Sequence, residues 1–154
     1  MRSYLVLMAT ATLILGACKK KANIGTSPII TYQRLVPNTV QSGSAKDTVN
    51  IIFTIQDGDG DIGNDPQTGV HDIYLKDSRS NQENPYFLPT IPSDAITPGE
   101  GINAACTLRV YASLFLLLRP DHPDGDTLDY EIYVKDKAGH KSNVIKTDKI
   151  YITP

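Results

Sequence analysis

The residues of this sequence with the clearest chemical potential are three aspartates separated by single residues. Asp57, Asp59 and Asp61 alternate with glycines in the segment 56–63. In an extended chain the three carboxylates would lie on one face, about 6–7 Å apart. At that spacing each charged neighbouring pair repels by about 2–3 kcal/mol at an effective dielectric constant of about 20. The glycines let the loop curl so that the oxygens converge, and a hard cation, Ca²⁺ above all, would convert this repulsion into binding.

A calcium site of this kind needs oxygens from outside the loop. We predict Asp136 as the additional ligand, because the residues that follow Asp57 and Asp136 would lie near each other if their strands were neighbours. Three other residues at predicted loops or strand ends are further candidates, namely Asp65, Asp72 and Asn143.

The same loop has a second interpretation as a solvated turn, in which Asp and Gly are the commonest residues. An EF-hand loop has Gly at its sixth position and Glu at its twelfth. Counted from Asp57, those positions hold Ile62 and Thr68. The loop is therefore not an EF-hand. A later acidic turn, at 121–126, has less regular spacing and is interpreted as an ordinary connection between strands.

The sequence contains no recognisable catalytic motif. HExxH, GxSxG, SxxK and phosphate-binding Gly-Lys patterns do not occur. The histidines His71, His122 and His140 are scattered, and Cys106 lies in an apolar stretch with no base beside it, which is typical of a buried, inert thiol. We therefore predict that the chain is not an enzyme. A hydrolase using the acidic loop is less favoured, because adjacent charged carboxylates without an apolar pocket make poor general acids.

Most of the remaining chain consists of short runs in which apolar and polar residues alternate, as they do in half-buried strands. Turn-forming residues separate the runs. The pattern predicts strands within 29–36, 49–56, 72–76, 108–112, 128–135 and 144–152. Six or seven short strands without sustained helical periodicity predict an all-β fold, an immunoglobulin-like β-sandwich of about seven strands. A small barrel is the alternative.

Two segments depart from this alternation. Leu114–Leu118 has five consecutive apolar residues, which predict a strand buried on both faces or, alternatively, a surface patch that meets a partner. The segment Pro85–Pro98 contains four prolines and is expected to be an irregular connection across one end or edge of the sheets.

The N-terminus has the features of a secretory signal. One positive charge, at Arg2, precedes an apolar stretch of residues 4–15, which is too short to span a bilayer but suits a signal peptide. The stretch ends in Leu15-Gly16-Ala17-Cys18, which resembles the lipobox of bacterial lipoproteins. The resemblance implies a signal peptide at 1–17, lipid on Cys18, a tether at 18–27 and a folded domain at 28–154.

The residues after the lipobox bear on location and partners. Lys19–Lys21 follow Cys18 with no Asp between, and similarity to sorted lipoproteins then favours the outer membrane, facing the periplasm. The expected partner is the membrane, through the lipid on Cys18. A net charge of −2 argues against a nucleic-acid binder, which needs a basic surface.

Three further stretches resemble a group of uncharacterised lipoproteins of Bacteroidota-type bacteria: Phe53–Gly63, Asp72–Asp77 and Tyr130–Asn143. Within the last, Asp136–Asn143 is similar to the F–G hairpin of bacterial immunoglobulin-like repeats, with His140 where Asn is usual. The resemblance implies an immunoglobulin-like β-sandwich and a lipid anchor, and no known activity.

These observations lead to two main hypotheses. The first is a non-enzymatic, lipid-anchored accessory or interaction module of the cell envelope whose acidic loop binds Ca²⁺. The second is a module that binds carbohydrate or peptide in the envelope through tyrosines and the proline-rich segment. A flat cluster of exposed aromatic side chains would favour the second, and dispersed tyrosines would count against it.

Overall fold

A computed structural model describes residues 25–96 and 99–154 of the chain. The predicted signal peptide at 1–17, Cys18 and the tether up to residue 24 lie outside the described residues. Strands make up 45% of the structure, and one short helix is present. The prediction of an all-β chain is therefore confirmed at the level of fold class. Within the described part, no helix is both long and apolar enough to cross a membrane.

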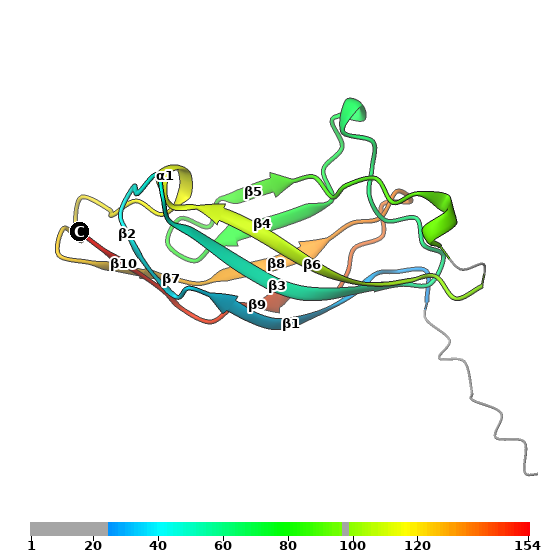
Figure 1. The fold of residues 1–154 in the computed structure, drawn as a ribbon, viewed down its shortest axis with the longest axis horizontal. Coiled ribbons are helices and arrows are strands. Elements are labelled where there is room, and N and C mark those ends of the chain that lie inside the picture. The colour runs from blue at the N-terminus through cyan, green and yellow to red at the C-terminus, as the bar shows by residue number, and fades with distance from the viewer. Residues whose placement is uncertain (1–24, 97–98) are drawn as a thin grey trace, which may run out of the picture.

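The strands form three sheets (Figure 1). The first is antiparallel, in the order β1-β3-β6, with bounds Ile29–Val36, Thr48–Asp57 and Ile102–Tyr111. The second, in the order β5-β4-β8-β9, comprises Glu83–Tyr86, Ile73–Asp77, Tyr130–Val134 and Ile145–Lys146. The third, in the order β2-β10-β7, comprises Thr39–Gln41, Ile150–Thr153 and Asp126–Leu128, with β2 parallel to β10.

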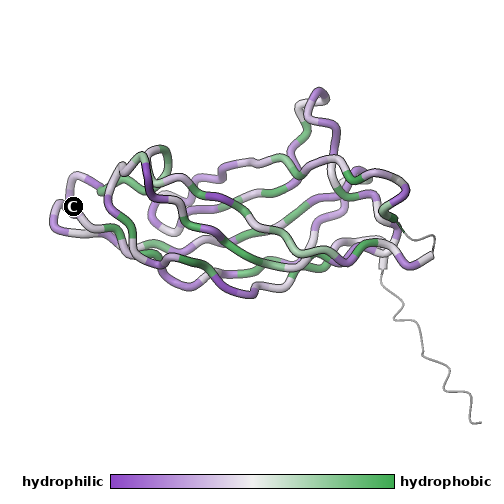
Figure 2. Tube along the Cα trace, viewed as in Figure 1, coloured by the Kyte–Doolittle hydropathy of each residue, from purple (hydrophilic) through white to green (hydrophobic). Residues whose placement is uncertain are grey.

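The hydrophobic core follows directly from the alternation in the sequence. Every second residue of β3 is buried, from Val49 to Asp57, and the residues between are partly exposed. Buried side chains from β3, such as Phe53, and from β8, such as Ile132, belong to one cluster that joins the sheets. Figure 2 shows hydrophobic residues recurring along the strands. Burying one such side chain stabilises the fold by about 1.5–3 kcal/mol.

The number of strands differs from the prediction. The structure has ten short strands where the sequence predicted six or seven. Two predicted strands are each divided in two: β7 and β8 are separated at Asp129, and β9 and β10 at Thr147–Lys149. The pattern also missed β2 and β5, which are short edge strands with little apolar alternation.

The prediction of a fully buried strand at Leu114–Leu118 is wrong. The chain forms the four-residue helix α1, Ala112–Phe115, and then continues irregularly. Leu116 is fully buried, whereas Leu114 is 65% exposed and Leu117 is 50% exposed. The run thus buries Leu116 and packs Phe115 and Leu118 partly against the core, while Leu114 and Leu117 stay exposed. A strand buried on both faces would cover all five side chains.

The proline-rich connection begins as β5 and then becomes irregular, with a 3-10 turn at Ser93–Ala95. Leu88 in this connection is buried in the core. The described part of this connection after Tyr86, residues 87–96, is irregular apart from the 3-10 turn, as predicted, and residues 97–98 lie outside the described residues.

Candidate metal centre

Strand pairing fixes where the acidic loop starts. Strand β3 pairs with β6 in continuous register as far as Asp57, which lies opposite Ile102. The residue before Ile102 is Gly101, with φ +65°, and a Cβ there would lie 2.0 Å from the Asp57 carbonyl oxygen and 2.7 Å from the Gly58 Cα. Only glycine permits this approach. The start of the loop is therefore held by backbone packing, and the Asp57 side chain projects from a rigid strand end.

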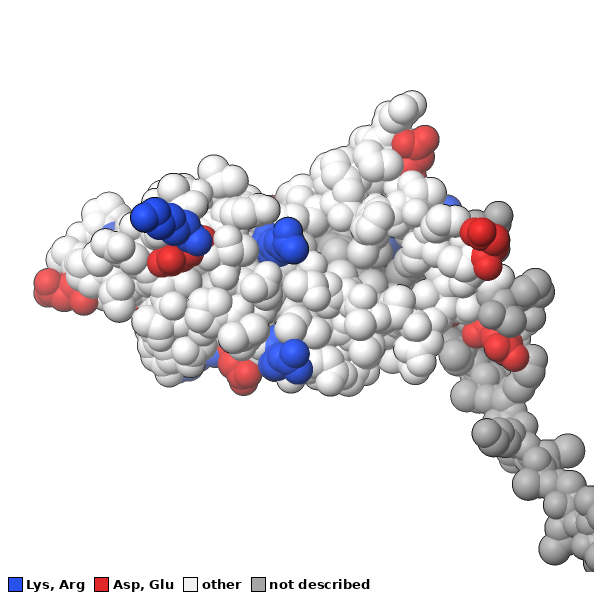
Figure 3. All heavy atoms as spheres, viewed as in Figure 1, with Lys and Arg blue, Asp and Glu red and all other residues white. Residues whose placement is uncertain are grey.

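A second segment holds the other side of the loop. In the hairpin between β8 and β9, the Lys137 N–H donates to the Asp61 carbonyl oxygen at 3.0 Å. The Ala138 N–H donates to Asp61 Oδ2 at 3.1 Å. The acidic loop and this hairpin therefore lie at the same end of the molecule, as the sequence predicted for the residues that follow β3 and β8. Figure 3 shows acidic side chains at both ends of the long axis.

The structure brings the three predicted loop ligands together. Asp57, Asp59 and Asp61 each offer a carboxylate oxygen, and these oxygens all lie within 4.8 Å of one another. Two oxygens bound at about 2.4 Å to one Ca²⁺ ion can be at most about 4.8 Å apart. The separation of the loop carboxylates is therefore compatible with one shared cation.

The three loop aspartates differ in how deeply they are buried. Asp57 is fully buried, Asp61 is half-buried and Asp59 is exposed. Both carboxylate oxygens of Asp57, and Oδ1 of Asp61, are buried without a hydrogen-bond partner. Buried polar atoms are normally hydrogen-bonded, and leaving one unpaired costs about 1–3 kcal/mol. A bound cation would satisfy these three oxygens, and a proton shared between Asp57 and Asp59 would satisfy part of the same demand.

The electrostatics of the loop agree with this geometry. Burial raises the pKa of Asp57 to about 7, helped by the charge of Asp59, by a side-chain hydrogen bond with Asp59, and by the charges of Asp61 and Asp136. The pKa of Asp61 is also raised, by burial and by Asp136 and Asp59, against the opposing Ala138 N–H and His140. A divalent cation would remove the repulsion that raises both pKa values.

Asp136 lies near the loop, but unlike Asp57 its carboxylate has hydrogen-bond partners. It is buried, and its Oδ1 accepts the His140 N–H at 2.7 Å while its Oδ2 lies 2.8 Å from His140 Nδ1. It is outside the group of three mutually close carboxylates. Asp136 is close enough to raise the pKa of Asp57 and of Asp61, and its role as a direct ligand stays a prediction.

The other candidate ligands have structural partners. Asp72 is fully buried and accepts hydrogen bonds from Asn64 and from the Leu88 N–H. Asp65 caps the 3-10 turn at Pro66–Thr68. Asn143 bonds both backbone groups of Ile30 in β1. These three residues hold the chain segments around the loop.

Sequence reasoning missed the contribution of His140. Hydrogen bonding to Asp136, and the charge of that carboxylate, raise the pKa of His140. When His140 is protonated, its imidazolium lies against Asp136 and offsets part of the negative charge around the loop. The available signal was the spacing of four residues between Asp136 and His140 across a tight hairpin turn.

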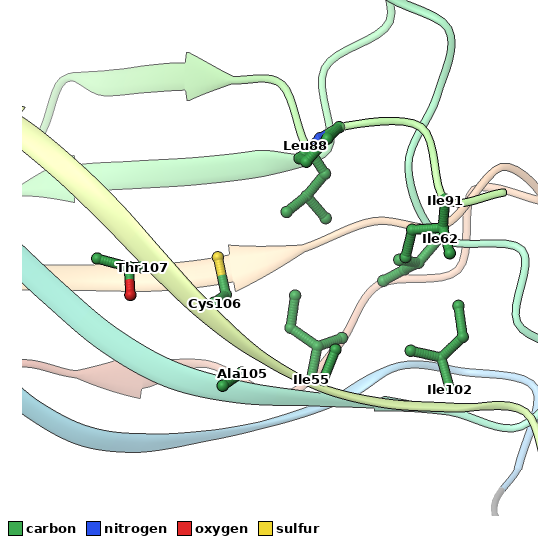
Figure 4. Close-up of a pocket in the computed structure, with 10 residues that line it drawn as sticks. Ile55, Ile62, Leu88, Ile91, Ile102, Ala105, Cys106 and Thr107 are labelled. Atoms are coloured by element: carbon green, nitrogen blue, oxygen red, sulfur yellow. The ribbon is translucent and has the colours of Figure 1, made fainter. Parts of the chain in front are cut away.

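An apolar pocket of about 220 Å³ lies beside the loop, between β6 and the proline-rich connection (Figure 4). Its walls include Ile55, Ile62, Leu88, Ile102 and Cys106. Burial raises the pKa of the half-buried Cys106 thiol to about 11, so the thiol is protonated at neutral pH. The three loop aspartates do not line this pocket, and the arrangement that a loop-based hydrolase would need is not formed there.

The chemistry available at this site is cation binding by carboxylate oxygens at the end of a rigid strand. No family model, curated protein or solved structure matches the chain.

Proposed function

We propose that this protein is a lipid-anchored, non-enzymatic module of the cell envelope whose acidic loop binds Ca²⁺. One observation carries the metal site: the Asp57 carboxylate is fully buried without a hydrogen-bond partner, beside Asp59 and Asp61. Oxygen ligands and a flexible loop suit Ca²⁺, which accepts six to eight oxygens in irregular geometry.

The strand order supports an immunoglobulin-like sandwich as the finer description of the fold. The order β1-β3-β6 corresponds to strands A, B and E of such a fold, and the order β5-β4-β8-β9 corresponds to C′, C, F and G. In this description the acidic loop follows strand B, and the Asp136–His140 turn joins strands F and G.

The proposed anchor rests on the lipobox-like sequence that ends at Cys18. Lipid on this residue would hold the domain at the envelope membrane, and the lysines that follow favour the periplasmic face of the outer membrane. Because fold alone does not supply an activity, the accessory role rests on the anchor and on the loop.

The metal would stabilise one end of the domain. The loop contacts the β8–β9 hairpin through Asp61, which accepts backbone hydrogen bonds from Lys137 and Ala138. A cation that removes repulsion among the loop carboxylates would strengthen this link between the two sheets.

A carbohydrate- or peptide-binding module is the second candidate, and the exposed tyrosines count against it. Tyr111 and Tyr151 are 46% and 47% exposed, and they belong to different sheets. Tyr74 and Tyr133 stack on each other at 4.8 Å between ring centroids and are only partly exposed.

Thermal unfolding tests the calcium site. For a dissociation constant of about 10⁻⁴–10⁻³ M, about 1 mM Ca²⁺ adds about 0.4–1.4 kcal/mol relative to EDTA. We expect a rise in Tm of a few degrees that Asp59→Ala abolishes. Asp124→Ala is the matched control, because Asp124 is exposed and lies in another loop. Equal melting in Ca²⁺ and EDTA for the unmodified protein would reject the site.

A further inference from the structure

We infer that the cation in the acidic loop also binds the phosphate of an anionic phospholipid, so that this end of the domain docks on the membrane. The inference rests on the proposed calcium site and names its partner. Three features carry it: where the described chain begins, how the loop is exposed, and which charges surround it.

The described chain begins beside the acidic loop. The Gly58 N–H donates to the Gly25 carbonyl oxygen at 3.1 Å, and Gly58 stands between two of the loop aspartates. In Figure 1 the described chain begins at the end of the domain opposite to the C-terminus. Six residues, 19–24, separate Cys18 from Gly25, and a chain of that length reaches at most about 25 Å. Lipid on Cys18 would therefore hold the acidic end near the bilayer surface.

The exposure of the loop leaves one side of the cation open. Asp57 would hold the ion from the buried side, and Asp59 stands on the exposed side. Ca²⁺ takes six to eight oxygens, and one oxygen of Asp61 is already bonded to the Ala138 N–H. The exposed side at Asp59 would leave room for further oxygen ligands, and phosphate oxygens are suitable ligands for Ca²⁺.

Basic residues near the loop would reduce the repulsion between this acidic end and an anionic surface. Three carboxylates around one Ca²⁺ leave a single negative charge, and basic residues adjoin the loop. Lys137 is exposed, and its N–H donates to the Asp61 carbonyl oxygen. Lys19–Lys21 precede Gly25 by only a few residues. Basic residues close to a bilayer are attracted to anionic lipid, and this attraction decays within a Debye length.

Vesicle flotation tests the inference with the chain from residue 18 carrying Cys18→Ser, which removes the lipid and keeps every described contact. The vesicles contain equal parts phosphatidylglycerol and phosphatidylcholine, and vesicles of phosphatidylcholine alone are the lipid control. We expect about 1 mM Ca²⁺ to raise binding to the anionic vesicles roughly tenfold, which corresponds to about 1.4 kcal/mol. Asp59→Asn should abolish the rise, and Asp124→Asn should retain it. Tm is measured in the same samples.

The possible results distinguish failure of the membrane contact from failure of the calcium site. A rise in Tm with Ca²⁺ but no calcium-dependent flotation would overturn the membrane contact and leave the calcium site standing. No change in either measurement would overturn both. Calcium-dependent flotation that survives Asp59→Asn would overturn the inference, because binding would not involve the loop. Loss of flotation when soluble glycerol phosphate is added at the same concentration as the anionic lipid would show that the site binds phosphate from any source. This result would also overturn a membrane-specific contact.

Discussion

Asp57 is the residue on which the account depends most. Its carboxylate is fully buried and unpartnered, and burial together with the charges of Asp59, Asp61 and Asp136 raises its pKa to about 7. The ordinary pKa of about 4 applies in the unfolded chain. Because the folded state binds this proton more tightly, the stability of the metal-free protein falls as pH rises from about 4 to about 7, and it stays lower above that range.

Asp57→Asn should remove this pH dependence. The amide carries no charge, so in EDTA at pH 8 we expect the variant to be more stable than the unmodified protein, by on the order of 2 kcal/mol. At pH 5 the difference should be smaller. Urea unfolding in EDTA at both pH values measures it, with Asp124→Asn as the control for net charge. A variant less stable than the unmodified protein at pH 8 would mean that other protein groups stabilise the Asp57 carboxylate.

At the scale of elements, one arginine joins α1 to the second and third sheets. Arg79 donates to both carboxylate oxygens of Asp77, to Asp126 and to the carbonyl oxygens of Phe115 and Leu117. Its side chain is only 10% exposed. These bonds hold the chain after α1 in its irregular path, which explains why the apolar run there does not continue as a strand.

Arg79→Ala should destabilise the protein by about 3–5 kcal/mol, because it leaves the buried Asp126 with fewer partners. Arg119, then the Thr127 N–H and Arg79, hold the pKa of Asp126 well below its usual range. A lowered pKa contributes stability above about pH 4 that is lost as pH falls further. The cost of the variant should therefore shrink below pH 4 in urea unfolding. Lys76→Ala, which breaks an exposed pair with Glu131, should cost less than about 1 kcal/mol; equal costs would contradict this role of Arg79.

The features that the sequence predicted correctly depend on residues close together in the chain. The two-residue period of apolar residues predicted β1, β3, β4 and β8, because a strand that is buried on one face needs an apolar residue at every second position. The spacing of the loop aspartates likewise gave the cluster that the structure forms. The path of Leu114–Leu118 and the packing of the Asp136–His140 turn against the acidic loop depend on contacts made only after the chain has folded. A local pattern does not contain such contacts.

At the scale of the whole molecule, the described chain begins at the same end as the acidic loop. The Gly25–Gly58 hydrogen bond connects the start of the described chain to the loop. We expect Cys18→Ala to move the protein from the membrane fraction to the soluble fraction of cells and to abolish incorporation of labelled palmitate. Cys106→Ala is the matched control. Membrane retention and label in Cys18→Ala would contradict the lipid anchor.

The most direct test of the central claim is calorimetric titration of Ca²⁺ at pH 7 in two buffers of different ionisation enthalpy. Because the pKa of Asp57 is about 7, roughly half of the metal-free molecules carry a proton there, and binding must release it. We predict one Ca²⁺ per chain, a dissociation constant of about 10⁻⁴–10⁻³ M, and the release of roughly half a proton that Asp57→Asn abolishes. No binding heat, or binding without proton release, would contradict a calcium site built on Asp57.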